Sequence, residues 1–493
     1  MQRNKVIKKL QETLKYSADS NILLKTFLSV IKEYRLTGIN TVLNKGKAKG
    51  VAGENIFKTL FIFLFIDLKN VSQLMASGFA SDLTHEKDVF YEFMKNEHID
   101  WRKILTSFSK QFIKISQKKG DPPTQKGDCP TKSTPKCIIV DDTLLPKTGK
   151  TIEFIGKVFD HCDRSFQLGI KILTMIYWDG KSIIPVDFSQ HNEPGKKKNR
   201  GLKQKDLDAQ FVKERQVGSP GHKRAQEVGV DKITMAVNMI KNAIKNSFEP
   251  LYALADSWFI NENFIAEIEK IKLKYAKKLF VIGLMKTDRF VIIGNKKLKA
   301  NTVPDHKMKD IKYCKSLKCN YIASKITYKG IELKAFWVKM KGQETWKMLI
   351  STDTSLNFIT AMKYYQIRWS IEVFFKECKQ NMGLNKCQST DFDAYTATIT
   401  LCFVNYIILA MRKRFDDYET FGEIFRSFKD ELLEATLVEK IWALIMELYV
   451  EIFAEMGVDL EKFVEMLINK QEKIENFIKQ SFQFLFSESK QVA

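Results

Sequence analysis

The spacing of apolar residues changes twice along the chain and predicts three kinds of structure. Residues 1–115 place apolar side chains at helical intervals with little β-branched alternation, so we expect helices there. Residues 116–135 are rich in Pro, Lys, Thr and Gly, which is typical of a linker. From residue 136 onwards, short apolar runs indicate β-strands that alternate with helices.

The strands and helices after the linker follow a recognisable order. The segment 136–143 is an apolar run followed by two aspartates and a threonine, and residues 165–190 contain two strands joined by a Trp-Asp-Gly turn. A helix over 223–246, a strand over 251–256 and a helix over 261–273 follow. This is the order of an α/β RNase H-like core, whose first part we expect over residues 136–276.

The remaining pattern predicts an interruption and then a return to helix. Residues 277–353 alternate apolar and polar positions between Gly and Asp turns, which indicates a β-rich insertion. Residues 354–411 are expected to complete the core, and 412–493 to form an acidic helical region. The apolar stretches 56–66 and 396–411 are too short to span a bilayer, so we expect buried helices and no membrane association.

Four polar side chains form a stripe on the helix that completes the core. Tyr365, Arg368, Glu372 and Lys379 fall within about 60° of arc, because each residue turns an α-helix by about 100°. The opposite side of the helix is apolar: Ile367, Ile371, Phe374 and Cys378. The stripe fits a solvated face with charge pairs, and it also fits a metal-binding carboxylate beside cations that hold phosphates.

Charge and cysteine usage narrow the possible functions. The formal net charge of +22 indicates a polyanionic partner, most often nucleic acid. Residues 412–493 hold 11 Lys and Arg against 17 Asp and Glu, so the basic charge lies in the rest of the chain.

The eight cysteines form no CxxC pair, which argues against a zinc site and favours a reducing cytoplasm. No GxxxxGK[ST] motif or apolar signal segment is present, so we expect neither ATP use nor export.

Three carboxylates belong to elements that meet in such a core. Asp142 and Asp256 lie at expected strand ends, and Glu372 lies on the polar stripe. Because the carboxyl ends of strands gather at one edge of an α/β sheet, a helix across that edge can add the third carboxylate. We expect Mg²⁺ there, with Mn²⁺ as a substitute, because divalent ions offset the charge and activate a water or a 3′-hydroxyl. Asp256 would otherwise cap the following helix.

These residues resemble the DDE transposases of the insertion-sequence-four family, whose catalytic domain belongs to the RNase H-like retroviral integrase superfamily. The family motif Tyr-x2-Arg-x3-Glu-x6-Lys is matched without a spacing error, from Tyr365 to Lys379. The first family Asp precedes a Thr, as Asp142 does, so we expect Asp142 to bind metal, although the sequence does not exclude Asp141. The second Asp follows a strand, as Asp256 does, and the likeness covers about residues 130–410.

The resemblance implies roles for the other polar residues. Within the motif, three side chains would contact DNA phosphates: Tyr365, Arg368 and Lys379. A Trp of the insertion would stack on a flipped base if excision passes through a hairpin, and we expect Trp346, with Trp337 as the alternate. In the basic loop 191–206, four further side chains are expected to meet phosphates: Lys196, Lys197, Lys198 and Arg200.

We therefore expect a bacterial, nucleoid-associated transposase that acts as a homodimer on double-stranded DNA, both terminal inverted repeats and target. Residues 1–115 would read the repeats, and residues 412–493 would serve protein–protein contact. Two alternatives remain open. A tyrosine recombinase would use Tyr365 as its nucleophile and need no metal, but the sequence shows no matching Arg-His-Arg set. A basic DNA-binding protein would keep the fold and lack the chemistry.

Overall fold

The computed structural model describes seven stretches of the chain: residues 38–47, 49–62, 71–76, 86–119, 135–160, 163–273 and 278–415. The chain divides into two compact units. One unit contains residues 36–57 and 90–421 and holds all the strands that the structure describes. Of the other unit, only short pieces within 58–89 are described. Residues 1–37 and nearly all of the acidic region 412–493 lie outside the described residues.

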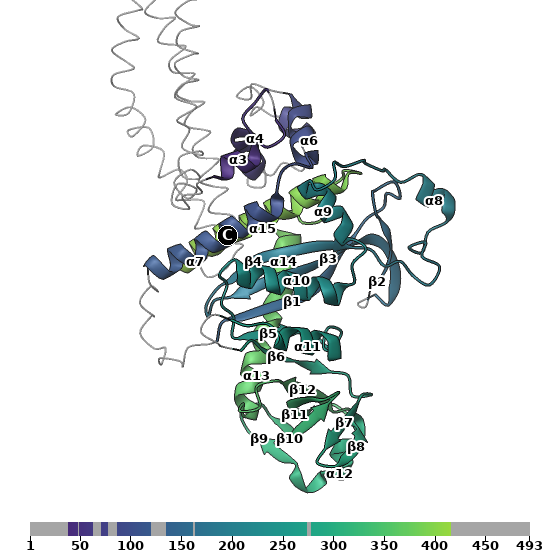
Figure 1. Ribbon diagram of the computed structural model, residues 1–493, viewed down its shortest axis with the longest axis vertical. Helices are drawn as coiled ribbons and strands as arrows, with labels where there is room; N and C mark the ends of the chain where they lie inside the picture. The colour runs from purple at the N-terminus through teal and green to yellow at the C-terminus, as the bar shows by residue number, and fades with distance from the viewer. Residues whose placement is uncertain are drawn as a thin grey trace, which may run out of the picture. The chain divides into compact units, whose positions relative to one another are not determined.

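A mixed β-sheet forms the centre of the larger unit (Figure 1). Its core strands lie in the order β4 (Ile183–His191), β3 (Ser165–Trp178), β1 (Cys137–Pro146), β5 (Tyr252–Ala255) and β6 (Phe280–Met285). Strand β3 is antiparallel to β1 and β4, whereas β5 runs parallel to β1 and β6. The predicted Trp-Asp-Gly turn joins β3 to β4, and a short strand β2 (Gly156–Asp160) pairs with the start of β3. This mixed sheet with helices fits an RNase H-like fold.

Helices cover both faces of the core sheet, which explains why its strands are nearly continuous apolar runs. Helix α10 (Lys232–Lys245) packs against β3 and β4 and against α11 (Glu262–Glu269). Helices α14 (Ser370–Gln380) and α15 (Phe392–Phe415) contact each other and β4. Successive side chains of β1 point to opposite faces, and they meet α10 on one face and the segment before α14 on the other.

The β-rich segment continues the core sheet instead of forming a separate one. Strand β12 (Lys347–Ser351) pairs with β6, and four further strands follow it in the sheet: β11 (Ile331–Met340), β10 (Cys319–Tyr328), β7 (Phe290–Ile293) and β8 (Lys296–Lys299). Strand β9 (Lys312–Cys314) pairs with β10. Short helical turns lie between β8 and β9: η3 (Ala300–Thr302), α12 (Val303–His306) and η4 (Met308–Asp310). Since β6 pairs in parallel with β5, the first strand of the expected insertion over 277–353 belongs to the core.

Two helices that the pattern predicts as continuous are interrupted. The expected helix over 223–246 is two helices, α9 (Pro220–Glu227) and α10, because Asp231 caps α10 through the backbone N–H groups of Ile233 and Thr234. The motif helix is also divided: α13 (Phe358–Gln366) passes through one 3₁₀ turn, η5 (Ile367–Trp369), into α14. Helix α8 (Gln204–Asp208) is an additional short element that begins within the end of the basic loop 191–206.

The segment 1–115 is helical where the structure describes it: α3 (Ile39–Leu43), α4 (Gly53–Ile62), α5 (Val71–Ala76), α6 (Lys87–Lys95) and α7 (Trp101–Lys119). Helix α7 extends into the expected linker and packs against β4 and α15. The end of the segment 1–115 therefore belongs structurally to the larger unit.

The apolar helix α15 is a core helix. Its length and hydropathy would allow it to cross a membrane, but 94% of its most apolar window is buried inside the protein. Asn405 and Thr400 on this helix are fully buried among apolar side chains. This confirms the prediction of a buried helix over 396–411.

Candidate active site

Asp141 and Asp256 lie side by side at one edge of the core sheet. The parallel register pairs Val140 of β1 with Ala255, the last residue of β5, so Asp141 and Asp256 are the next residues along the two segments. Strand β1 continues past Asp141 and Asp142 to Pro146, so the expected strand end at Asp142 is not observed. Burial, followed by the charge of Asp256, raises the pKa of Asp141 to about 7. Two carboxylates held this close destabilise each other unless a positive charge lies between or beside them.

Asp142 points to the opposite face of β1. Its carboxylate accepts a hydrogen bond from Lys232 Nζ at 2.7 Å and lies 3.5 Å from Lys171 Nζ. Lys171 is almost fully buried and also reaches Glu193. Asp142 is therefore paired with two lysines and is directed away from Asp256. This geometry goes against our assignment of Asp142 as a metal ligand and favours Asp141.

Arg368 joins the third carboxylate to the first. Its guanidinium donates to Asp141 Oδ2 at 3.1 Å and to Glu372 Oε1 at 2.6 Å. The 3₁₀ turn η5 presents Arg368 beside the sheet edge, and Glu372 follows on the first turn of α14. Glu372 is about one-third exposed, at 37% of its side-chain surface. Arg368 thus supplies the positive charge that Asp141 and Glu372 share in the structure.

Tyr365 and Lys379 complete the motif stripe. The Tyr365 ring lies 5.8 Å from the Arg368 guanidinium carbon, and burial raises the pKa of Tyr365 to about 12 against the opposing effect of Arg368. A tyrosine nucleophile needs a hydroxyl with a lowered pKa, whereas burial raises the pKa of Tyr365. Lys379 is half-buried in the last turn of α14. Three residues of the predicted apolar side are buried, Ile371, Phe374 and Cys378. The fourth, Ile367, is half-buried, because it lies in the 3₁₀ turn before α14.

The oxygen donors at this edge suit a divalent metal, although the side chains do not form a closed cage. Within the described ranges, no three His, Cys, Asp or Glu side chains are close enough together to hold a metal ion. Asp141, Asp256 and Glu372 nevertheless supply carboxylate oxygens, the ligands that Mg²⁺ prefers. Burial and the charge of Asp256 both raise the pKa of Asp141, so its ionised form needs a compensating positive charge. The donor set therefore fits the expected metal.

Four tryptophans differ in burial, and therefore in whether a ligand could contact their rings. Trp337 is fully buried and donates its indole N–H to the Ala300 carbonyl at 2.7 Å, so it is a core residue. Trp346 is half-buried in the loop before β12, whose residue Met348 pairs with Met285 at the end of β6. Two exposed tryptophans were not singled out from the sequence: Trp258 and Trp369, at 42% and 61% exposure.

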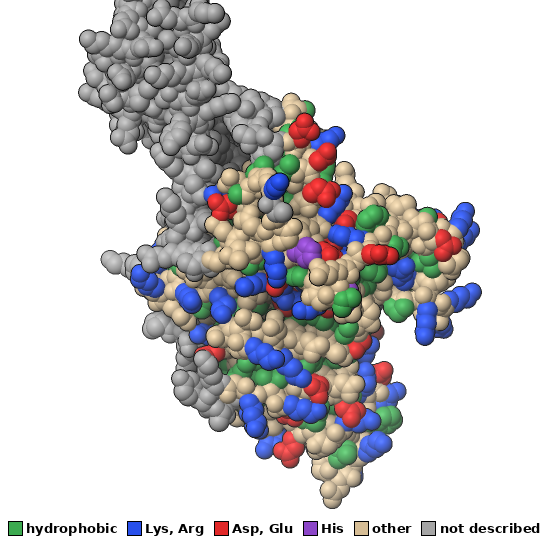
Figure 2. Space-filling view, turned by 45° about the horizontal axis from the view of Figure 1, so that its top comes forward, with side chains coloured by type: hydrophobic (Ala, Val, Ile, Leu, Met, Phe, Trp, Pro, Cys, Tyr) green, Lys and Arg blue, Asp and Glu red, His purple; other side chains and the backbone are tan. Residues whose placement is uncertain are grey.

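The basic loop after β4 is exposed. Three side chains project into solvent, Lys196, Lys197 and Lys198, and Arg200 is half-buried. Lys198 and Arg200 have positive φ angles of 55° and 53°, so the loop turns tightly before α8. Lys and Arg side chains are spread over the face of the molecule shown in Figure 2, including the lobe that this loop forms with α8. The loop suits phosphate contact but does not touch the carboxylates through any hydrogen bond that the structure shows.

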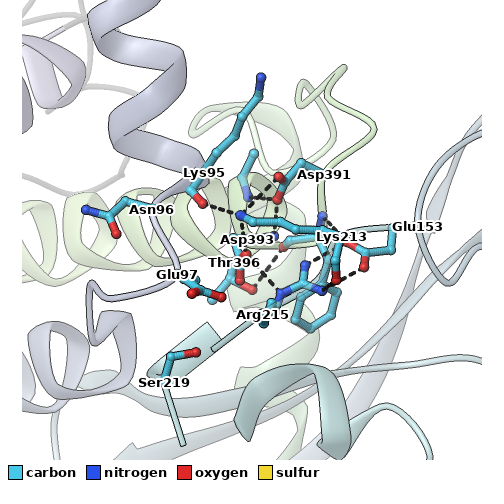
Figure 3. A network of polar contacts seen from close by, with 12 residues as sticks. Lys95, Asn96, Glu97, Glu153, Lys213, Arg215, Ser219, Asp391, Asp393 and Thr396 are labelled. Carbon is cyan, nitrogen blue, oxygen red and sulfur yellow. Dashed lines mark hydrogen bonds and ion pairs between the residues drawn. The ribbon is translucent and has the colours of Figure 1, made fainter. Parts of the chain in front are cut away.

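A buried ion network holds the loops next to the core in place (Figure 3). Arg215 donates two hydrogen bonds to Glu153, both of 2.7 Å, and a third to Asp393 at 3.0 Å. Lys213 bonds the same Asp393 and also Asp391. Burial alone would lower the pKa of Arg215, but the bonds to Glu153 and the charge of Asp393 raise it. The network ties the loop after β1 and the loop before α9 to the start of α15.

Comparison with known families gives one result. A family model described as "Transposase DDE domain" matches residues 132–408, which is more than half of the chain. The match begins just before β1, ends inside α15 and so contains every residue of the site described above. No curated protein matches the chain.

Proposed function

The chain belongs to the Transposase DDE domain family, and we propose that it catalyses cut-and-paste DNA transposition in the manner of the insertion-sequence-four group. The observation that carries the proposal is that Arg368 bonds both Asp141 and Glu372, while the charge of Asp256 acts on Asp141. We propose Asp141, in place of Asp142, as the first catalytic carboxylate. Phosphodiester cleavage at the end of an element, and joining of the freed 3′-hydroxyl to target DNA, are the reactions that this site would support.

The three carboxylates would hold Mg²⁺ or Mn²⁺ at the sheet edge. The metal would activate the attacking oxygen and stabilise the leaving oxygen. Asp141 and Asp256 are positioned for this by the β1–β5 register, and Glu372 by α14. The same residues would then serve successive cleavage and joining steps without a covalent bond between protein and DNA.

Arg368 and its neighbours would bind the phosphates of the substrate. In the structure Arg368 neutralises Asp141 and Glu372, and its planar group can instead donate to a phosphate. Tyr365 lies beside it, and Lys379 follows two turns after Glu372 on α14. We propose that the basic loop around 196–200 adds phosphate contacts farther along the DNA.

Two rival functions have less support. A tyrosine recombinase would depend on Tyr365, whose pKa burial raises to about 12. A DNA-binding protein without catalysis would not need Asp141 and Asp256 close together, where their repulsion costs stability.

We propose that the functional form is a homodimer that pairs two terminal inverted repeats. The segments assigned to repeat recognition and to protein contact lie largely outside the described residues.

Replacing Glu372 tests the proposed chemistry. Glu372→Gln should lower cutting of linear DNA with terminal repeats by roughly 1,000-fold in Mg²⁺, because one carboxylate ligand worth about 4 kcal/mol of barrier is lost. Binding of the same DNA should persist. Glu377→Gln is the matched control, since Glu377 lies on the same helix and bonds only Asn381 among the contacts shown. Denaturing gels with Mg²⁺ or EDTA give the measurement.

The possible gel results separate the three functions. Cutting at the repeat boundary that needs Mg²⁺ and is lost in Glu372→Gln supports the transposase. Cutting that persists in EDTA contradicts a metal-dependent site and favours the recombinase. Tight binding without cutting in any metal leaves the silent DNA-binding protein.

Trp346 is proposed to hold a flipped base if excision uses a hairpin. Trp346→Ala should then reduce hairpin formation by roughly 5- to 150-fold, the equivalent of about 1–3 kcal/mol of stacking, while the first nick remains. Trp346→Phe should restore most of the activity. Time courses on denaturing gels, which resolve nicked and snap-back products, measure both steps. Equal loss of nicking and hairpin products would contradict a role in base flipping.

A further inference from the structure

The second aspartate of the Asp141-Asp142 pair anchors a cluster on the other face of β1. Asp142 accepts a hydrogen bond from Lys232 at 2.7 Å, and Lys232 lies 3.9 Å from Glu193. Lys171 bridges the same two carboxylates, at 3.5 Å from Asp142 and 3.3 Å from Glu193. The two lysines and two carboxylates balance each other's charge, so the cluster is a fixed structural unit.

An exposed aromatic side chain rests on this cluster. Lys232 Nζ lies 4.3 Å from the centre of the Trp258 ring, close enough for a cation–π contact. Trp258 also packs edge-to-face with the buried Phe259 at a ring separation of 5.0 Å. Trp258 is nevertheless 42% exposed. The ring is therefore held in one orientation while a large part of its surface faces solvent.

The backbone places Trp258 next to a proposed metal ligand. The Trp258 N–H donates to Asp256 Oδ1 at 2.5 Å, in the turn that follows β5. An exposed tryptophan costs solvation free energy, and here it stands two residues from a catalytic carboxylate in a strongly basic protein. DNA bases stack on such rings whatever their sequence, because every base has a π-face.

We propose that Trp258 is a nucleotide-stacking residue at the edge of the active site, positioned by Lys232 and Asp142. It contacts the nucleotide next to the scissile phosphate, on the side of the sheet away from Arg368. This inference rests on the proposed transposase function and adds a contact outside the Tyr-Arg-Glu-Lys motif. It also gives Asp142 a role: Asp141 serves the catalytic face, and Asp142 positions the stacking residue on the opposite face.

The test uses the full-length protein with DNA ends that carry 2-aminopurine, whose fluorescence falls when it stacks on an aromatic ring. The probe is placed on the element side of the cleavage position in one DNA and on the flanking side in another. In the absence of a divalent metal, we expect wild-type protein to quench one of the two probes, and that probe identifies the nucleotide bound. Trp258→Ala should abolish the quenching and weaken binding by roughly 5- to 150-fold, whereas Trp258→Phe should keep most of both.

Phe290→Ala is the matched control. Phe290 is exposed and has Lys297 over its ring at 5.4 Å, so it is the same kind of cation–aromatic pair, located on β7 of the insertion. Its loss should change neither quenching nor binding. Equal effects of the two variants, or unchanged quenching in Trp258→Ala, would overturn the inference.

The results also distinguish this inference from the proposed function. If the protein shows Trp258-dependent quenching but does not cut DNA in Mg²⁺, the inference about Trp258 is supported and the proposed transposase function is contradicted. If the protein cuts DNA normally but quenches neither probe, with or without Trp258, the inference about Trp258 is contradicted and the proposed function is not. Circular dichroism of each variant establishes that the fold is retained.

Discussion

Asp141→Asn is expected to lower metal-dependent DNA cutting by roughly 1,000-fold, because it removes a carboxylate ligand worth about 4 kcal/mol of barrier. The stability of the protein should stay the same or rise. Burial and the charge of Asp256 both raise the pKa of Asp141, so its ionised form is unfavourable in the folded protein. Loss of the Arg368 contact offsets part of this gain. Cutting is measured on denaturing gels, and stability by urea unfolding.

Asp142→Asn should have the opposite effects: it should lower the stability of the protein and leave most of the DNA cutting. Its carboxylate partners Lys171 and Lys232, and removing that charge from beside the buried Lys171 should cost about 1–3 kcal/mol of unfolding free energy. Cutting should remain within about ten-fold of the wild-type rate, an effect of about 1.4 kcal/mol or less. A variant Asp142→Asn that no longer cuts, beside an active Asp141→Asn, would reverse our assignment of the first catalytic carboxylate.

Arg215→Met is expected to have the largest effect on stability, about 3–5 kcal/mol, because it leaves the buried charge of Glu153 without a cationic partner. Glu153 would lose both of its hydrogen bonds to the guanidinium, and Asp393 would keep only Lys213. Both carboxylates are almost fully buried, with side chains 4% exposed. The protein should unfold at a clearly lower urea concentration, and cutting should fall only as the folded fraction falls.

Two further variants give this prediction its controls. Lys307→Met breaks an exposed pair with Asp310 and should leave the unfolding midpoint almost unchanged. Adding Glu153→Gln to Arg215→Met should recover part of the lost stability, because the charge left without its bidentate partner is then removed. If Arg215→Met unfolds at the wild-type midpoint, the network does not hold the loops as we infer.

Much of the fold was predictable because it depends on local spacing. The apolar runs before Asp141 and Asp256 become strands β1 and β5, and the Trp-Asp-Gly turn becomes the β3–β4 hairpin. The buried side of α14 follows the 3.6-residue period of its apolar side chains. The interruption between α9 and α10 was missed, although Asp231 is a recognisable capping residue.

Tertiary pairing decided what local spacing could not. The segment 280–285 has the alternation of an insertion strand, but its parallel pairing with β5 makes it part of the core. Trp337 and Trp346 both lie in the expected β-rich insertion, and the sequence does not distinguish their burial. The packed structure shows that Trp337 is buried and bonded to the Ala300 carbonyl. Burial depends on which elements come together, and no short stretch of sequence contains that information.

The family motif, the basic charge and the carboxylates that follow two apolar runs can be read from the sequence, because they depend on residue identity and spacing. The expected strand end at Asp142 is wrong, because β1 continues through both aspartates to Pro146, paired with β3. Choosing between Asp141 and Asp142 required the arrangement of the strands in space. Neighbouring residues of a strand point to opposite faces, so the choice depends on the register between β1 and β5, which are distant in the chain. That register places Asp141 beside Asp256 and Arg368, and turns Asp142 towards Lys171 and Lys232.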